Sequence, residues 1–416
     1  MAGTVRVPGD KSISHRTLIL GALASGNSRV RHILDSEDVR STAGALRALG
    51  ASIPAIGPDM LVAGSGLGGL REARASLDCG NSGTTTRLLA GVAAAQPFAT
   101  RFEGDASLSR RPMKRVAEPL TTMGARFEFA NGDGLPMTIR GSKLTGIDWD
   151  TRAASAQVKS AILLAGVASG VEVHVTEKAR SRDHTERMLR AMGVAVRVHG
   201  NRVTACPADR LEAIDVDVPA DPSSAAFFIA LASLAKSGAL TLTDVCLNPT
   251  RTGFISAMMR MGARIETVEM TTSGGEDVGT LRVTPSDLKS VKVDENEVPS
   301  LIDELPLLAC VAAAAGVELE ITGAEELRVK ESDRISTVVQ NLRGVGAEAE
   351  ERPDGLRVLP TRRTLAGTVD PHGDHRIAMA FGVLSAASGN RITVTNRECV
   401  AVSYPGFWDD LQRVTA

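Results

Sequence analysis

Aromatic side chains are scarce in this chain of 416 residues, where they make up 3% of the sequence with a single tyrosine. Few aromatic rings leave little on which nucleic-acid bases could stack. An excess of basic charge is missing as well, because 47 Lys and Arg face 49 Asp and Glu, for a net charge of −2. Proteins that bind nucleic-acid phosphates carry a basic surface. Both shortages argue against a nucleic-acid-binding protein.

Cysteine is also sparse, and no C-x-x-C pair occurs among the five cysteines. This pattern predicts neither a zinc knuckle nor a disulfide framework, and it favours a reducing compartment. The N-terminal MAGTVRVPGD has no apolar core of a signal peptide, and the motif VPGDKS follows too closely for a transit peptide. The longest apolar stretches, at 225–235 and 305–317, are shorter than a membrane span. We therefore expect a soluble cytoplasmic protein.

A short phrase recurs along the chain, in which the end of an amphipathic helix is followed by a glycine and an alternating strand. It appears as LRALGASI, LTTMGARFE, LRAMGVAVRV, MMRMGARIE and LRGVGAEAE. A glycine in the left-handed conformation is a common helix end. The spacing of about seventy residues predicts six α/β modules, the last one near 374–414. The repeated glycines are Gly50, Gly124, Gly193, Gly262 and Gly346.

A chain of this length exceeds one ordinary core, so the modules are expected to group by threes into two lobes. The Pro, Asp and Ser cluster at 216–228 marks a plausible boundary. We expect one lobe at 11–219 and a second at 1–10 plus 220–416, with the active site in the cleft between them.

The stretch LDCGNSGTTTRLLAG (77–91) places small hydrogen-bonding residues immediately before an apolar helix. Small residues let an anion approach the unpaired N–H groups of a helix start. The same residues also suit an N-cap and a tight turn. A P-loop is excluded because the stretch lacks the lysine of that motif.

Other helix starts repeat this pattern. In GDKSISHR, Lys11 and Arg16 stand around a helix start, either to reach a ligand or as surface charge beside an N-cap at Ser12. The small-residue pattern itself recurs where Ser155 and Gln157 precede an apolar run with Lys159 in its first turn, and in ADPSSAAFF at 220–228, which makes three starts with GNSGTTTR. One such start is usually only a cap, but three of them favour an anion-binding cleft. The run SLSRRPMKR adds Arg110, Arg111, Lys114 and Arg115 beside Pro112, which suits either a guanidinium fork for carboxylate or phosphate or a solvated basic face.

Three further motifs carry acidic and basic groups. RVKESDRI places Glu331 between Lys330 and Arg334, as an acid/base group or as a surface pair. Asp303 and Glu304 precede the apolar run of LIDELPLLA, as a base or as a cap. DPHGDHRIAMAFG adds His372, Asp374, His375 and Arg376, and a metal site at His372, Asp374 and His375 is an alternative.

Taken in order, GDKSISHR, GNSGTTTR, SLSRRPMKRV, SAQVKS, RVKESDRI and DHRIAMAFG resemble the enolpyruvyl transferase family from end to end. The resemblance implies an inside-out α/β barrel fold with two lobes, each of three βαββαβ modules. SLSRRPMKR lacks the loop cysteine of the amino-sugar branch, so the shikimate branch is favoured.

The resemblance implies transfer of the enolpyruvyl group of phosphoenolpyruvate to the 5-hydroxyl of shikimate 3-phosphate, with release of phosphate, in the shikimate pathway of aromatic amino-acid biosynthesis. It implies no metal or organic cofactor, no nucleic-acid or membrane partner, a monomer, and glyphosate as a competitive inhibitor. The amino-sugar transferase, a non-catalytic anion-binding scaffold and an RNA-processing enzyme remain as alternatives.

The resemblance also implies roles for individual residues. Asp303 takes the hydroxyl proton, Glu331 protonates the methylene of phosphoenolpyruvate, and Lys11 and Lys330 stabilise the intermediate. The implied substrate-binding residues are Lys11, Gly83 and Arg111 for the phosphate of phosphoenolpyruvate, Arg334 and Arg376 for its carboxylate, Ser12, Arg16, Ser155, Gln157 and Arg182 for shikimate 3-phosphate, with Asn81, Thr84, Lys330, Asp303 and His375 beside them.

The chain departs from the family in one place and matches a particular branch in others. Val402 stands where many members carry a lysine that binds the phosphate of phosphoenolpyruvate. RDHTER and NPTR are similar to a branch with many glyphosate-tolerant members, although Gly83 is retained. Glyphosate tolerance is therefore a hypothesis.

Overall fold

The computed structural model describes residues 1–152, 154–387 and 389–415 and divides into two compact units. The N unit comprises 9–218 and 272–276, and the C unit comprises 1–8, 219–271 and 277–416. Compared with the lobes expected from the sequence, the boundaries move by one or two residues. The segment 272–276, expected in the second lobe, clusters with the N unit.

The N unit is built from small sheets in which a parallel pair of strands is extended by antiparallel strands. The sheet orders are β14-β3-β4, β5-β6-β8-β7 and β11-β12-β10-β9, with a short pair β13-β2. The strands are β2 (Ala24–Ser25), β3 (Asn27–Arg31), β4 (Asp59–Ala63), β5 (Leu77–Asp78), β6 (Ala99–Glu103), β7 (Arg126–Phe129), β8 (Met137–Arg140), β9 (Ile147–Asp150), β10 (Val173–Thr176), β11 (Val196–His199), β12 (Arg202–Ala205), β13 (Leu211–Glu212) and β14 (Val216–Asp217). The helices are α1 (Lys11–Leu23), α2 (Glu37–Ala48), α3 (Gly83–Ala94), α4 (Ala106–Ser109), α5 (Lys114–Met123), α6 (Ala156–Ser169) and α7 (His184–Ala191).

The C unit repeats this plan with sheet orders β1-β15-β17-β16 and β18-β19-β21-β20 and the parallel pair β22-β23. Its strands are β1 (Ala2–Val5), β15 (Ala239–Cys246), β16 (Arg264–Ser273), β17 (Glu276–Thr284), β18 (Val291–Val293), β19 (Leu319–Ile321), β20 (Glu348–Arg352), β21 (Gly355–Leu359), β22 (Ala366–Val369) and β23 (Arg391–Val394). Its helices are α8 (Pro222–Leu234), α9 (Gly253–Arg260), α10 (Val298–Leu301), α11 (Leu305–Ala315), α12 (Arg334–Gly344), α13 (His375–Ala386) and α14 (Phe407–Thr415), with 3₁₀ helices η1 (Ile302–Glu304), η2 (Glu325–Val329) and η3 (Arg397–Val402).

The α/β class and the grouping into three modules per unit are confirmed, but the order of elements within a module is not βαββαβ. In β9-α6-β10-α7-β11-β12 and in β18-α11-β19-α12-β20-β21 the order is βαβαββ. The reason is physical. The parallel pair β9 and β10 needs a crossover helix between its strands, whereas the antiparallel β11 and β12 are joined by a short turn.

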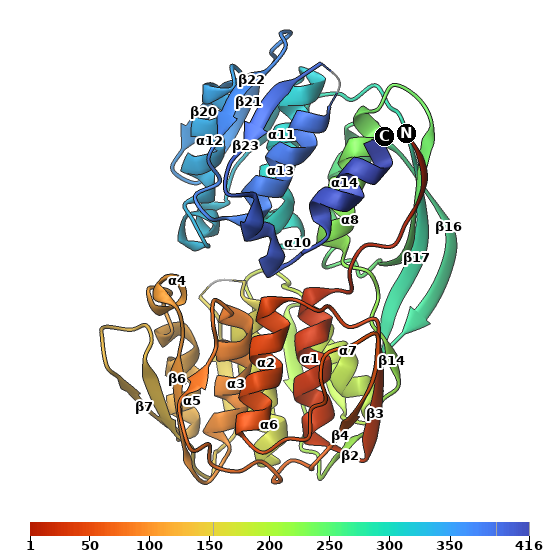
Figure 1. Ribbon diagram of the computed structural model, residues 1–416. Coiled ribbons are helices and arrows are strands. Elements are labelled where there is room, and N and C mark those ends of the chain that lie inside the picture. The colour runs from red at the N-terminus through yellow and green to blue at the C-terminus, as the bar shows by residue number, and fades with distance from the viewer. Residues whose placement is uncertain (153, 388, 416) are drawn as a thin grey trace. The chain divides into compact units, whose positions relative to one another are not determined.

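Each unit encloses helices that are apolar on nearly every side. In the N unit the amphipathic α2 lies beside α1 and α3 (Figure 1), and the helices that are apolar on nearly every side are α1, α3 and α6, of which α3 and α6 pack together. Such helices are stable only when they are surrounded by protein. Their approach is close, because a Cβ at Gly91 of α3 would lie 2.2 Å from the backbone oxygen of Ala161 in α6. The corresponding enclosed helices of the C unit are α8, α11 and α13.

The recurring glycines act as the sequence predicts. All five have a positive φ, between 82° at Gly50 and 122° at Gly124. Each stands at or just after the end of a helix, and an L side chain is strained in this left-handed region. These glycines therefore set the point at which the chain leaves each outer helix.

One helical stretch, Val298–Ala315, is long and apolar enough by composition to cross a membrane, whereas the apolar run predicted there, 305–317, is shorter than a membrane span. It consists of α10, η1 and α11, and 67% of the window is buried inside the protein. Burial of this kind is typical of a core helix in a globular fold, and α11 is one of the enclosed helices of the C unit.

Candidate active site

The starts of α1, α3 and α6 in the N unit are capped by the side chain of the preceding residue. Asp10 accepts a hydrogen bond from Ile13 N at 2.8 Å at the start of α1, so the cap there is Asp10 rather than Ser12. Ser82 accepts from Thr85 N at 3.1 Å before α3, and Ser155 accepts from Val158 N at 3.5 Å before α6. Capping thus explains part of the small-residue pattern, and the neighbouring side chains decide what else these starts do.

The starts of α3 and α6 are joined through Gln157. Its amide nitrogen donates to Thr84 Oγ1 at 3.0 Å, and its Oε1 accepts from Arg87 Nη1 at 2.6 Å. Gly83 lies against the same guanidinium, because a Cβ there would be 2.9 Å from Arg87 Nη1 and 3.4 Å from Arg111 Nη1. The structure therefore brings together the predicted Gly83, Thr84, Arg111 and Gln157, and it adds Arg87, which was not among the predicted residues.

Asn81 fixes Arg111 beside this cluster. Its Oδ1 accepts from Arg111 Nη2 at 2.5 Å, and its Nδ2 donates to Asp105 Oδ2 at 2.6 Å. A guanidinium held in place by an amide is a preorganised donor for a carboxylate or a phosphate. Of the basic run predicted here, Arg111 is the member that lies beside Gly83.

The start of α1 carries two cations with different surroundings. Lys11 forms an ion pair with Asp38 of α2, and the side chain of Lys11 keeps 20% of its exposure. Arg16 is 3% exposed, and it donates to Thr185 Oγ1, Ser160 Oγ and Ser12 O at 2.7–2.9 Å. Burial lowers the pKa of Arg16 to about 10, which leaves it protonated at neutral pH. Arg182 Nη1 lies 3.5 Å from Ser12 Oγ, so these two predicted residues are neighbours.

The C unit has a carboxylate and guanidinium cluster at the starts of α11, α12 and α13. Arg334, the first residue of α12, has a side chain that is 1% exposed. It reaches Asp374 at 2.8 Å, Glu331 at 2.7 Å and Asp303 at 3.2 Å. Burial opposes its charge, but these carboxylates outweigh burial and raise the pKa of Arg334. The predicted pair Asp303 and Glu331 thus shares one guanidinium.

Two further cations flank Asp303. Lys330 Nζ lies 3.6 Å from Asp303 Oδ1, and Arg376 Nη2 lies 3.7 Å from Asp303 Oδ2. Arg376 Nη1 also contacts Glu304 Oε1 at 3.2 Å, and Glu304 is 3% exposed. His375 is buried as the first residue of α13. The five charged site residues predicted for the second lobe therefore lie together in this cluster: Asp303, Lys330, Glu331, Arg334 and Arg376.

The metal-site alternative at His372, Asp374 and His375 finds no support in the geometry. The carboxylate oxygens of Asp374 accept hydrogen bonds from Arg334, Ser332 and the N–H of Arg376. His372 is exposed, and its ring lies 3.7 Å from Asp370. Within 1–152, 154–387 and 389–415, no group of three His, Cys, Asp or Glu side chains is placed to hold a metal ion.

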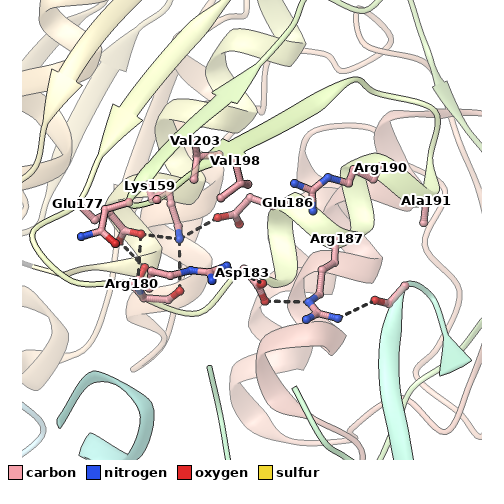
Figure 2. Close-up of a pocket in the computed structure, with 14 residues that line it drawn as sticks. Lys159, Glu177, Arg180, Asp183, Glu186, Arg187, Arg190, Ala191, Val198 and Val203 are labelled. Carbon is pink, nitrogen blue, oxygen red and sulfur yellow. Dashed lines mark hydrogen bonds and ion pairs between the residues drawn. The ribbon is translucent and has the colours of Figure 1, made fainter. Parts of the chain in front are cut away.

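A cavity of about 530 Å³ lies in the N unit, and Figure 2 shows the side chains around it. Lys159, Glu177 and Glu186 border the cavity together with Ser181, the residue before Arg182. None of the predicted substrate-binding residues lines it.

Comparison with known proteins identifies the family. A family model described as EPSP synthase (3-phosphoshikimate 1-carboxyvinyltransferase) matches residues 1–411. The chain belongs to the EPSP synthase family. A 3-phosphoshikimate 1-carboxyvinyltransferase of Sulfurihydrogenibium sp. is 49% identical over 99% of this chain and 97% of the relative. One of Bacillus subtilis is 43% identical over 99% and 97%.

A solved EPSP synthase structure from Acinetobacter baumannii is similar with a TM-score of 0.89 and 40% sequence identity, over 100% of this chain and 96% of that one. The EPSP synthase fold expected from the motifs is therefore confirmed, as is the family itself.

Proposed function

We propose that this member of the EPSP synthase family transfers the enolpyruvyl group of phosphoenolpyruvate to the 5-hydroxyl of shikimate 3-phosphate and releases inorganic phosphate. The observation that carries the proposal is the sharing of Arg334 by Asp303 and Glu331. The reaction needs a base for a hydroxyl proton and an acid for a methylene carbon. Two carboxylates on one buried guanidinium, flanked by Lys330 and Arg376, supply that combination.

The chemistry proceeds in two steps. Asp303 takes the proton of the 5-hydroxyl as its oxygen bonds to C2 of phosphoenolpyruvate, while Glu331 gives a proton to C3. The resulting tetrahedral intermediate then loses a proton from C3 to Glu331 as the C2–O bond to phosphate breaks. Lys11 and Lys330 stabilise the charge that develops in the intermediate.

The two anionic substrates are bound by cationic side chains and by the small residue Gly83. Lys11, Gly83 and Arg111 hold the phosphate of phosphoenolpyruvate, and Arg334 and Arg376 hold its carboxylate. Arg334 is occupied by Glu331, so a substrate carboxylate replaces that contact and frees Glu331 to act as the acid. The shikimate 3-phosphate residues are Ser12, Arg16, Ser155, Gln157 and Arg182, with Asn81, Thr84 and His375 in supporting positions.

We also propose a monomer located in the cytoplasm that works without metal or organic cofactor. Its five cysteines are free thiols, which fits a reducing compartment. Sedimentation of the purified chain as a dimer would contradict the monomer.

Glyphosate is proposed as an inhibitor that competes with phosphoenolpyruvate, and the motifs RDHTER and NPTR are the basis for proposing tolerance. Val402 in place of a lysine removes one cation and alters the affinity for both compounds. An inhibition constant for glyphosate no higher than the KM for phosphoenolpyruvate would refute the tolerance.

The reaction is tested by phosphate release from phosphoenolpyruvate with either shikimate 3-phosphate or UDP-N-acetylglucosamine as acceptor. We expect release with shikimate 3-phosphate alone. Release with the nucleotide sugar alone would overturn the substrate, and no release with either acceptor would favour a non-catalytic scaffold.

Gly83→Ala should raise the KM for phosphoenolpyruvate about tenfold, a loss of ~1.4 kcal/mol of binding. The KM for shikimate 3-phosphate should rise less, through Gln157, which accepts a hydrogen bond from Arg87. The added Cβ would lie 2.9 Å from Arg87 Nη1 and displace that guanidinium, and it would contact Arg111 Nη1 at 3.4 Å. Gly44→Ala in α2 is a matched control, because its Cβ would meet nothing within 4 Å. An unchanged KM for phosphoenolpyruvate in Gly83→Ala would refute this role.

A further inference from the structure

Lys159, Glu177 and Glu186 form a buried charged triad in the N unit (Figure 2). Lys159 Nζ lies 2.7 Å from Glu177 Oε2 and 2.8 Å from Glu186 Oε1. The side chains are 2%, 2% and 1% exposed. Burial of an ion pair is costly unless its geometry is good, so a fully buried triad calls for a reason other than stability alone.

Lys159 keeps its charge despite burial. Burial opposes the ammonium charge, but Glu186 and Glu177 outweigh it and raise the pKa of Lys159. Glu186 also acts on the buried Arg16, where it raises the pKa but is outweighed by burial. In the part of the chain that the structure describes, Glu186 Oε2 accepts no hydrogen bond. Glu186 therefore depends on the ammonium of Lys159 for its position.

The triad fastens the loop that carries Arg182. Ser181 donates from its N–H to Glu177 Oε2 at 3.3 Å and from its hydroxyl to Glu177 Oε1 at 2.5 Å, and its carbonyl accepts from Lys159 Nζ at 3.4 Å. Glu186 holds the other side of the loop, because it belongs to the first turn of α7. Arg182 stands between these two anchors, with its guanidinium beside Ser12.

Lys159 also belongs to the helix whose start carries Ser155 and Gln157, since all three lie within the first turns of α6 and its cap. The next residue, Ser160, contacts both Arg16 and Thr185. The triad thus ties the α6 start and the Arg182 loop to each other at fixed geometry.

We propose that Lys159, Glu177 and Glu186 are positioning residues that align Arg182 with the α6 start to recognise the phosphate of the acceptor substrate. This inference rests on the proposed function. It predicts an effect that falls mainly on the phosphorylated acceptor, because the triad holds Ser181, the neighbour of Arg182.

The test compares Lys159→Met, Arg182→Ala and the double variant in the full-length protein. We expect Lys159→Met to raise the KM for shikimate 3-phosphate about tenfold, and its calorimetric Kd likewise, with the KM for phosphoenolpyruvate and kcat unchanged. Binding of shikimate, which lacks the phosphate, should not change. The double variant should bind shikimate 3-phosphate no more weakly than Arg182→Ala, because residues that act as one unit are not additive.

Lys159→Arg should restore binding, since it keeps a cation between the two carboxylates. Lys178→Met is the matched control, because Lys178 is exposed and adjoins Glu177 on the same loop. If Lys159→Met does not fold, Glu177→Gln decides the question with the same expected outcomes, because it preserves side-chain volume.

Equal losses for shikimate and shikimate 3-phosphate, or additive losses in the double variant, would overturn the positioning role. Absence of phosphate release by the unmodified chain would instead overturn the proposed function and the inference with it. Calorimetry separates the two failures. If the unmodified chain does not bind shikimate 3-phosphate, the proposed function fails. If the unmodified chain binds it and Lys159→Met binds it equally tightly, only the positioning role fails.

Discussion

Glu331→Gln should slow phosphate release with shikimate 3-phosphate by about 10²–10⁴-fold, the range typical of a lost general acid. The amide has the volume of the carboxyl, and its oxygen can still accept from Arg334 Nη2, which Glu331 contacts at 2.7 Å. It cannot deliver a proton to the methylene of phosphoenolpyruvate. The loss should therefore fall on kcat, with the KM of each substrate little changed.

A coupled assay for inorganic phosphate measures this effect, and thermal denaturation checks that the variant is folded. Glu325→Gln is the matched control, because Glu325 is an exposed glutamate in η2, close to Glu331 in the chain. We expect the control to retain full activity. Full activity of Glu331→Gln would remove Glu331 from the role of acid and weaken the whole assignment.

The repetitive part of the fold was open to prediction because its signals are local. A glycine after an amphipathic helix is readable from a few neighbours, and Gly193 and Gly346 stand in the structure where that pattern places them. The order of strands within a module was not readable in this way. It depends on which strands pair in parallel, as β18 and β19 do, and this pairing is a property of the assembled sheet.

In the site, contacts within one motif could be predicted from the sequence, whereas contacts between separate helices could not. Residues within one motif, such as Glu331 and Arg334, are one helical turn apart, so their contact follows from spacing. Arg87 was within reach of the same argument, since it follows Gly83 by four residues in α3. The pairing of Lys11 with Asp38 was not, because two separate helices must pack before the two side chains meet.

The burial and the partners of a charged residue cannot be read from its motif alone. Lys159 reads from the sequence as a basic residue in the first turn of a helix, which is usually exposed. In the structure it is enclosed by Glu177 and Glu186, which come from the loop after β10 and from α7. No spacing rule connects these three positions, so only the packed unit reveals them as a group.

The second large effect is expected at Asp374, whose replacement by alanine should destabilise the protein by about 3–5 kcal/mol, the cost of breaking a buried ion pair. Asp374 is fully buried and accepts from Arg334 Nε at 2.8 Å, from Ser332 Oγ at 3.1 Å and, as the N-cap of α13, from Arg376 N at 3.0 Å. Its loss leaves Arg334 with Glu331 and Asp303 alone, so these carboxylates shift toward the guanidinium and activity falls as well.

Asp374→Asn separates the two roles of this side chain. The asparagine oxygen can still cap α13, a contribution of about 1 kcal/mol, but it carries no charge for Arg334. Chemical denaturation should therefore order the free energy of unfolding as unmodified, Asp374→Asn and then Asp374→Ala, with the larger step at the first change. Asp370→Ala serves as the control, because Asp370 belongs to the same loop with a side chain that is 52% exposed. Equal stability of Asp374→Asn and the unmodified chain would show that the charge on Asp374 is dispensable. The fixed position of Arg334 would then have to come from Glu331 and Asp303.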